Sequence, residues 1–72
     1  MPRVTVEAVN QAIAAAGGQE RLWRAPGGRF WLYGGDSPRW PETLVYVSRL
    51  SSLSLEGWVA EWRRLAAAAT NR

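Results

Sequence analysis

Three consecutive segments decide the fold: Arg21-Leu-Trp-Arg24, Ala25-Pro-Gly-Gly28 and Arg29-Phe-Trp-Leu-Tyr33. The first and the third are rich in aromatic and apolar residues, which favour β-strands. The segment between them has the length and the glycines of a hairpin turn. We therefore expect two antiparallel strands, at about residues 21–24 and 29–33.

A third strand is expected at about residues 43–47, where Thr43-Leu-Val-Tyr-Val47 is almost entirely β-branched or aromatic. Between the second and third strands, Gly34-Gly-Asp-Ser-Pro38 ends the β pattern, and Pro41 keeps the chain irregular around Trp40. Two alternatives stay open for Trp40. Its ring either folds back over a small core or is presented by the loop as a binding residue.

The first predicted helix covers about residues 6–16. Thr5 is a favourable N-cap, and the Glu7 carboxylate lies in the first turn, where the helix dipole favours it. Gly17-Gly18 supplies a left-handed stop. The helix has one apolar stripe, formed by Val6, Val9, Ile13 and Ala16.

The second predicted helix covers about residues 55–68, with Ser54 as its N-cap and Leu53 placed to pack against Trp58. Its apolar stripe consists of Leu55, Trp58, Val59, Trp62, Leu65, Ala66 and Ala69. We expect Trp58 and Trp62 to lie in the core, and Arg63-Arg64 to lie on the solvated side.

The order helix, three strands, helix predicts a single α+β domain of 72 residues with αβββα architecture. A three-stranded antiparallel sheet would carry both helices on one face and leave its other side open. A chain this short has a thin core, and it contains neither Cys nor His, so disulfides and the usual zinc and haem ligands are excluded. Dense aromatic packing or formation of a homodimer must then support the fold.

The open side of the sheet is the candidate binding site. Strand alternation turns Phe30 and Leu32 toward the helices. The candidate binding residues are Arg29, Trp31, Tyr33 and Tyr46, with either Trp23 or Arg24 from the first strand and Arg39 and Trp40 from the loop. Exposed aromatic patches mark contact sites, and Trp and Arg are enriched in them. Alternatively, a second copy or the Trp40 loop covers this side, and the rings are ordinary packing.

Composition argues against catalysis. All nine basic residues are Arg, so the chain has no His, Cys or Lys to act as a base or nucleophile near neutral pH. Gly27-Gly28 and Gly34-Gly35 lack the flanking residues of a phosphate-binding loop. We expect a protein that is not an enzyme and that has no cofactor and no metal.

The net charge of +3 suits an anionic partner without requiring one. Glu7, Asn10 and Gln11 interrupt the N-terminal apolar residues, which argues against a signal peptide. No segment approaches the roughly 20 apolar residues of a membrane span. We expect a cytoplasmic protein without a membrane partner.

Three segments together carry a resemblance: Phe30-Trp-Leu-Tyr33, Trp40-Pro-Glu-Thr-Leu-Val-Tyr-Val47 and Arg49-Leu-Ser-Ser-Leu-Ser-Leu-Glu-Gly-Trp58. Over about residues 21–65 the chain resembles short proteins encoded in prophages and mobile elements of proteobacteria, a pool that includes anti-CRISPR and other anti-defence inhibitors. The resemblance implies a phage-associated protein that occludes a large host complex. Many anti-CRISPR proteins are acidic DNA mimics, and this basic chain departs from that pattern.

The sequence thus favours a small interaction protein that binds and blocks a host protein or ribonucleoprotein complex. The alternative is a nucleic-acid-binding module that stacks bases on the basic, aromatic side of its sheet. Salt separates the two, because affinity for phosphates falls steeply as the salt concentration rises.

Overall fold

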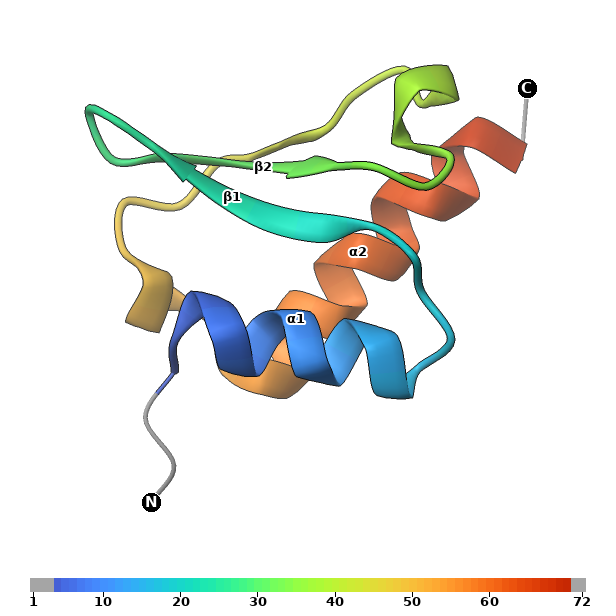
Figure 1. The fold of residues 1–72 in the computed structure, drawn as a ribbon. Coiled ribbons are helices and arrows are strands. Elements are labelled where there is room, and N and C mark those ends of the chain that lie inside the picture. Colours follow the sequence, from blue (N-terminus) through green and yellow to red (C-terminus); the bar gives the residue numbers. More distant parts are fainter. Residues whose placement is uncertain (1–3, 71–72) are drawn as a thin grey trace.

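The computed structural model describes residues 4–70. It contains two helices and three strands in the order helix, three strands, helix, with two short 3-10 turns, and so confirms the predicted α+β class. The elements are α1 (Val6–Ala15), β1 (Arg21–Ala25), β2 (Arg29–Tyr33), η1 (Ser37–Arg39), β3 (Leu44–Val45), η2 (Leu50–Ser52) and α2 (Leu55–Thr70). The sheet is antiparallel with the order β1-β2-β3, and both helices lie on one of its faces (Figure 1).

The β1–β2 hairpin forms where it was predicted, with β1 ending at Ala25, one residue beyond the predicted end at 24. Leu22 lies opposite Leu32 and Trp23 opposite Trp31. Gly27 and Gly28 have φ angles of +86° and +78°, so the turn uses a backbone conformation that suits glycine. The outer edge of β1 is partly closed, because the Leu22 N–H donates to Asn10 Oδ1 of α1 at 2.6 Å.

The predicted extent of the third strand was wrong, since β3 covers Leu44–Val45 rather than residues 43–47. The ladder begins near Thr43, whose carbonyl accepts the Leu32 N–H at 3.0 Å. It ends because the Val47 N–H donates to the Val45 carbonyl at 3.1 Å. Such a bond between residues two apart bends the backbone and stops the pairing.

Both ends of α1 are satisfied by local chemistry. Thr5 is the N-cap, and its Oγ1 accepts the Ala8 N–H at 3.0 Å. At the other end the Gly18 N–H donates to the Ile13 carbonyl at 2.9 Å, while Gly17 has a φ of +91°. This is the Schellman arrangement, and it ends the helix at Ala15, one residue earlier than predicted.

The start of α2 also follows the prediction, because Ser54 Oγ accepts the Gly57 N–H at 3.0 Å. The helix continues to Thr70, two residues beyond the predicted end at 68. Trp58 is 1% exposed, and its Nε1–H donates to the Leu50 carbonyl at 2.9 Å. Its ring meets Phe30 edge-on at a centroid distance of 5.5 Å, so α2 packs directly on β2.

The core lies between the sheet and the two helices. It consists of Val9, Ile13, Leu22, Phe30, Leu32, Val45, Trp58 and Leu65. Trp62 was expected in the core, but it is only partly buried at the margin. A Cβ added at Gly18 would lie 2.5 Å from Ile13 Cγ2 and from Trp62 Cζ2, so the link between α1 and β1 needs glycine there.

Candidate functional site

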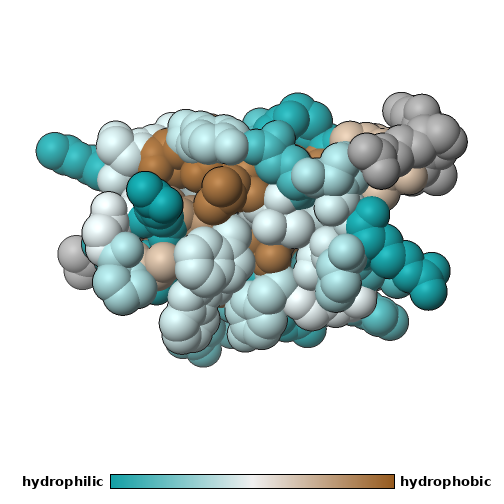
Figure 2. Space-filling model, turned by 90° about the horizontal axis from the view of Figure 1, so that it is seen from above, coloured by the Kyte–Doolittle hydropathy of each residue, from teal (hydrophilic) through white to brown (hydrophobic). Residues whose placement is uncertain are grey.

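The side of the sheet away from the helices carries the candidate site. We define the outer face by the residues that alternate with buried Leu22, Phe30, Leu32 and Val45 along the ladders. The outer face consists of Arg21, Trp23, Ala25, Arg29, Trp31, Tyr33 and Leu44, of which Ala25 is buried. Figure 2 looks onto it from above: side chains of intermediate hydropathy spread over its centre beside an apolar strip, and strongly hydrophilic ones stand at the margins.

Three rings form the centre of the outer face. Trp23 and Tyr33 meet edge-to-face, with their ring centroids 6.3 Å apart and an interplanar angle of 90°. Together with Trp31 they border an open depression. Trp23 and Tyr33 are each 48% exposed. An edge-to-face ring pair contributes about 0.5–1.5 kcal/mol of stability in addition to the burial of its surface. The rings therefore hold one another in place while a large part of their surface stays in contact with solvent.

Tyr46 lies at the β3 margin of the outer face. It borders a second depression together with Arg29 and Leu44, and it is 75% exposed. The Tyr46 hydroxyl hydrogen bonds to the Glu42 carboxylate, and this bond, reinforced by the negative charge, raises the pKa of Tyr46 above its ordinary value. The hydroxyl proton of Tyr46 is therefore held by Glu42, while its ring stays open to solvent.

Trp40 lies at the η1 margin of the outer face. It is partly buried and packs against the core, as the first of the two alternatives for this loop required. It still borders a depression that it shares with Trp31 and Tyr33. Its neighbour Arg39 is exposed on η1.

The structure brings together Arg29, Trp31 and Tyr33, with Tyr46 and Trp40 at opposite margins. It does not bring Arg24 to them. Arg24 pairs with Phe30 across the ladder, and its guanidinium carbon lies 5.9 Å from the centre of the Phe30 ring. Of the two alternatives for the first strand, Trp23 therefore belongs to the outer face. Arg24 lies on the opposite side of the sheet.

Besides buried Ala25, two outer-face residues were not singled out from the sequence, namely Arg21 and Leu44. Both could have been found by alternation once the register was known, since Arg21 lies opposite Tyr33 and Leu44 opposite Trp31. Arg21 is directed back to its own chain, because its Nη1 donates to the Glu20 carbonyl at 2.8 Å. Within residues 4–70, the Arg29 guanidinium makes no comparable hydrogen bond or ion pair, so Arg29 is the outer-face arginine that is available to a partner.

No group of three or more acidic residues among residues 4–70 is placed to hold a metal ion. No helix of the described residues is long and apolar enough to cross a bilayer. Comparison of the chain with protein-family models, with curated proteins and with solved structures finds no match.

Proposed function

We propose that the protein is a non-enzymatic interaction domain whose outer face binds a partner protein. The observation that carries this proposal is the cluster of Trp23, Trp31 and Tyr33 on a sheet face that no helix covers. Small soluble domains rarely expose several large rings side by side unless the patch makes a contact. Trp and Tyr are also the residues that most often dominate the free energy of protein–protein binding.

The distribution of charge favours a protein over a nucleic acid as the partner. A surface that binds a nucleic-acid strand combines stacking rings with a continuous basic groove. Here Arg21 bonds to its own backbone, and Arg24 lies on the other side of the sheet. Arg63 and Arg64 lie on α2. Arginines dispersed in this way favour solubility, but they do not form the continuous basic groove that would bind successive phosphates.

Blocking a host protein or ribonucleoprotein complex is the form of this function that the resemblance to prophage proteins implies. Such a role requires only a rigid surface that occupies part of the target. The ladder pairs and the edge-to-face ring contact supply that rigidity, and the role needs no reactive side chain.

Affinity capture from a lysate of the source cells tests the proposal. The bait is the wild-type protein, compared with Trp23→Ala and Tyr33→Ala, each first shown to be folded by circular dichroism. Loss of a central ring costs about 2 kcal/mol or more, or roughly 30-fold in affinity, so both variants should lose the captured partner. Arg29→Ala should weaken capture, and Arg63→Ala, an exposed arginine on α2, is the matched control that should retain it.

Nuclease treatment and a salt series complete the experiment. Capture should survive nuclease and should decline only modestly as the salt concentration rises. Capture that nuclease abolishes would assign the outer face to nucleic acid instead. Folded Trp23→Ala and Tyr33→Ala variants that bind like the wild type would place the site elsewhere.

Light scattering at micromolar concentration addresses the homodimer. We expect a monomer, which leaves the outer face free for a partner. A wild-type dimer that Trp31→Glu converts to a soluble monomer would show that a second copy covers the face, and the proposal would fail.

A further inference from the structure

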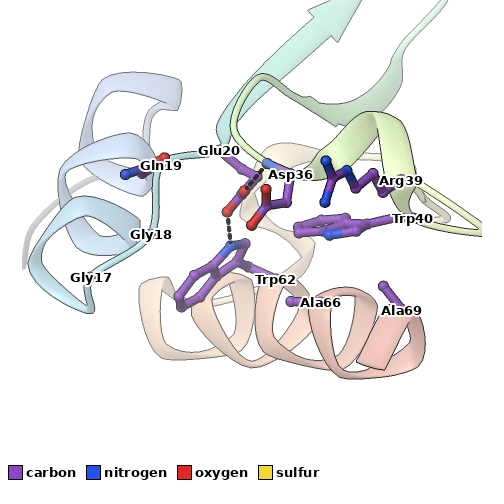
Figure 3. A pocket seen from close by; sticks show the side chains of 10 residues that line it. All are labelled: Gly17, Gly18, Gln19, Glu20, Asp36, Arg39, Trp40, Trp62, Ala66 and Ala69. Atoms are coloured by element: carbon purple, nitrogen blue, oxygen red, sulfur yellow. Dashed lines mark hydrogen bonds between the residues drawn. The ribbon is translucent and has the colours of Figure 1, made fainter. Parts of the chain in front are cut away.

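A second site lies at the end of the molecule where α2, the η1 segment and the link between α1 and β1 meet. Figure 3 shows this hollow from close by, with Ala66 between the two indoles along α2 and the carboxylates opposite. We name it the Trp40–Trp62 hollow, lined chiefly by Glu20, Asp36, Trp40, Trp62, Ala66 and Ala69. Its volume is about 570 Å³, within the range of about 300–1,000 Å³ of small-ligand sites.

The hollow exists because α2 carries small side chains where a larger one would fill the space. Leu65 is fully buried in the core, whereas Ala66 and Ala69 face the segment between residues 34 and 40. The Trp62 indole lies beside Ala66 on α2, and the Trp40 indole lies across the hollow from Ala66 and Ala69 (Figure 3). The floor is therefore apolar, and the walls combine two indoles with charged side chains.

Two carboxylates, those of Glu20 and Asp36, line this hollow. Glu20 is 5% exposed, and its carboxylate accepts Trp62 Nε1–H and the Asp36 N–H, each at 2.8 Å, with further backbone hydrogen bonds at Gln19 and Glu20. Burial acts to raise the pKa of Glu20, but these hydrogen bonds outweigh burial and hold the pKa below its ordinary value. No Arg side chain of residues 4–70 lies within ion-pair distance of Glu20 or Asp36.

An ionised, buried carboxylate is normally paired with a cation. Indole faces attract cations more strongly than other rings do, and the attraction grows when water is displaced. We infer that the Trp40–Trp62 hollow binds the guanidinium group of an arginine side chain from a partner polypeptide. Asp36, which is exposed, would receive the N–H donors directly, and Glu20 would act through its charge.

A guanidinium group fits better than an ammonium group for two reasons. It is planar, so it can stack on an indole, and its forked N–H groups match a carboxylate with two parallel hydrogen bonds. Arg39 already places a guanidinium beside Trp40 at the rim of the hollow (Figure 3). Because its charge repels an incoming cation, Arg39 should limit the affinity of the site.

This inference does not rest on the function proposed for the outer face. The Trp40–Trp62 hollow shares only Trp40 with the depressions that border that face. Variants of Asp36 and Ala66 leave Trp23, Trp31 and Tyr33 untouched, so failure of one proposal would leave the other standing.

Titration of the ¹⁵N-labelled protein with N-acetyl-arginine amide tests the inference at low salt. The indole N–H signals of Trp40 and Trp62 should shift in a saturable way, with a dissociation constant on the order of 1 mM for a ligand of about 15 non-hydrogen atoms. The citrulline analogue has nearly the same shape without the charge, and it should not saturate. N-acetyl-lysine amide should bind more weakly than the arginine compound.

Four variants of the full chain locate the site. Asp36→Asn removes a charge, Ala66→Leu fills the floor, and each should weaken binding about tenfold or more. Glu56→Gln and Ala67→Leu make the same chemical changes at exposed positions of α2, and they should bind like the wild type. Arg39→Ala should tighten binding.

Three results would overturn the inference. The first is equal binding of the citrulline analogue. The second is unchanged affinity in folded Asp36→Asn. The third is binding of tetramethylammonium as tight as that of the arginine compound, which would assign the hollow to small organic cations rather than to a polypeptide side chain.

Discussion

Glu20 shows how one side chain can join distant parts of a chain. Its carboxylate accepts a backbone N–H from a residue 16 positions away and an indole N–H from a residue 42 positions away. The link after α1, the η1 segment and α2 therefore meet at a single buried acid. A Cβ at Gly35 would clash with the same carboxylate, so glycine there lets the η1 segment approach.

The pKa of Glu20 leads to a prediction about pH. Because the folded-state pKa is lowered from 4.5, the ionised carboxylate stabilises the fold above that pH, and this contribution is lost as the pH falls through the folded-state value. Glu20→Gln replaces one acceptor oxygen with an NH₂ group that faces an N–H donor. The variant should melt lower than the wild type at pH 7, and the gap should narrow below about pH 4.5.

Thermal melts of both proteins from pH 7 to pH 3 measure this gap. A Glu20→Gln gap that stays constant across the pH range would contradict the assignment.

At this scale the sequence predicts local chemistry and misses distant contacts. Thr5 and Ser54 could be predicted as N-caps, because an N-cap hydrogen bond joins residues only three apart in the sequence, as both of these bonds do. The role of Glu20 could not be predicted, since no residue pattern near Glu20 in the sequence indicates its hydrogen bonds with Trp62 and Asp36. The choice between Trp23 and Arg24 was open for a similar reason, because it depends on how β1 pairs with β2.

At the scale of the element, Trp58 is the residue that connects α2 to two other parts of the fold. Trp58 contacts Phe30 of β2, and its indole N–H reaches the carbonyl of Leu50 in η2. The ring therefore attaches both the sheet and the preceding loop to the helix. Trp23, on the other side of the sheet, has a comparable ring but no such burial.

This contrast predicts two very different mutational effects. Trp58→Ala should cost about 3–5 kcal/mol of unfolding free energy, because it opens a large cavity and leaves the Leu50 carbonyl without its donor. Trp23→Ala should cost about 1 kcal/mol, mainly the lost contact with Tyr33. Denaturant unfolding of both variants measures the two values. Equal costs would mean that the sheet faces are assigned the wrong way round.

Both helices and the first two strands were predictable, since periodicity and turn residues within each segment decide them. The third strand was not, because its propensity continues to Val47 while the backbone bends after Val45. A bend of that kind is a property of the conformation rather than of the residue types.

At the scale of the molecule, two helices on one side of the sheet leave the other side open (Figure 1). The apolar stripes predicted this arrangement, because a single sheet face can cover both of them. The Trp40–Trp62 hollow was beyond prediction. It needs the C-terminal half of α2, the η1 segment and the α1–β1 link to come within reach of one another, which is a matter of tertiary geometry.

The large sequence separation of the Trp62–Glu20 hydrogen bond also has a consequence for the folding kinetics. The β1–β2 hairpin closes over a short loop and can form within microseconds, whereas a bond between residues 42 apart requires most of the chain to be in place. We expect this bond to be absent from the transition state for folding.

Trp62→Phe should then speed unfolding and leave the folding rate nearly unchanged. Gly28→Ala, which strains the hairpin turn, should instead slow folding, and stopped-flow fluorescence over a range of denaturant distinguishes these behaviours. Such a chain would have its lifetime in the folded state set by the docking of its last helix, and its speed of folding set by its first hairpin.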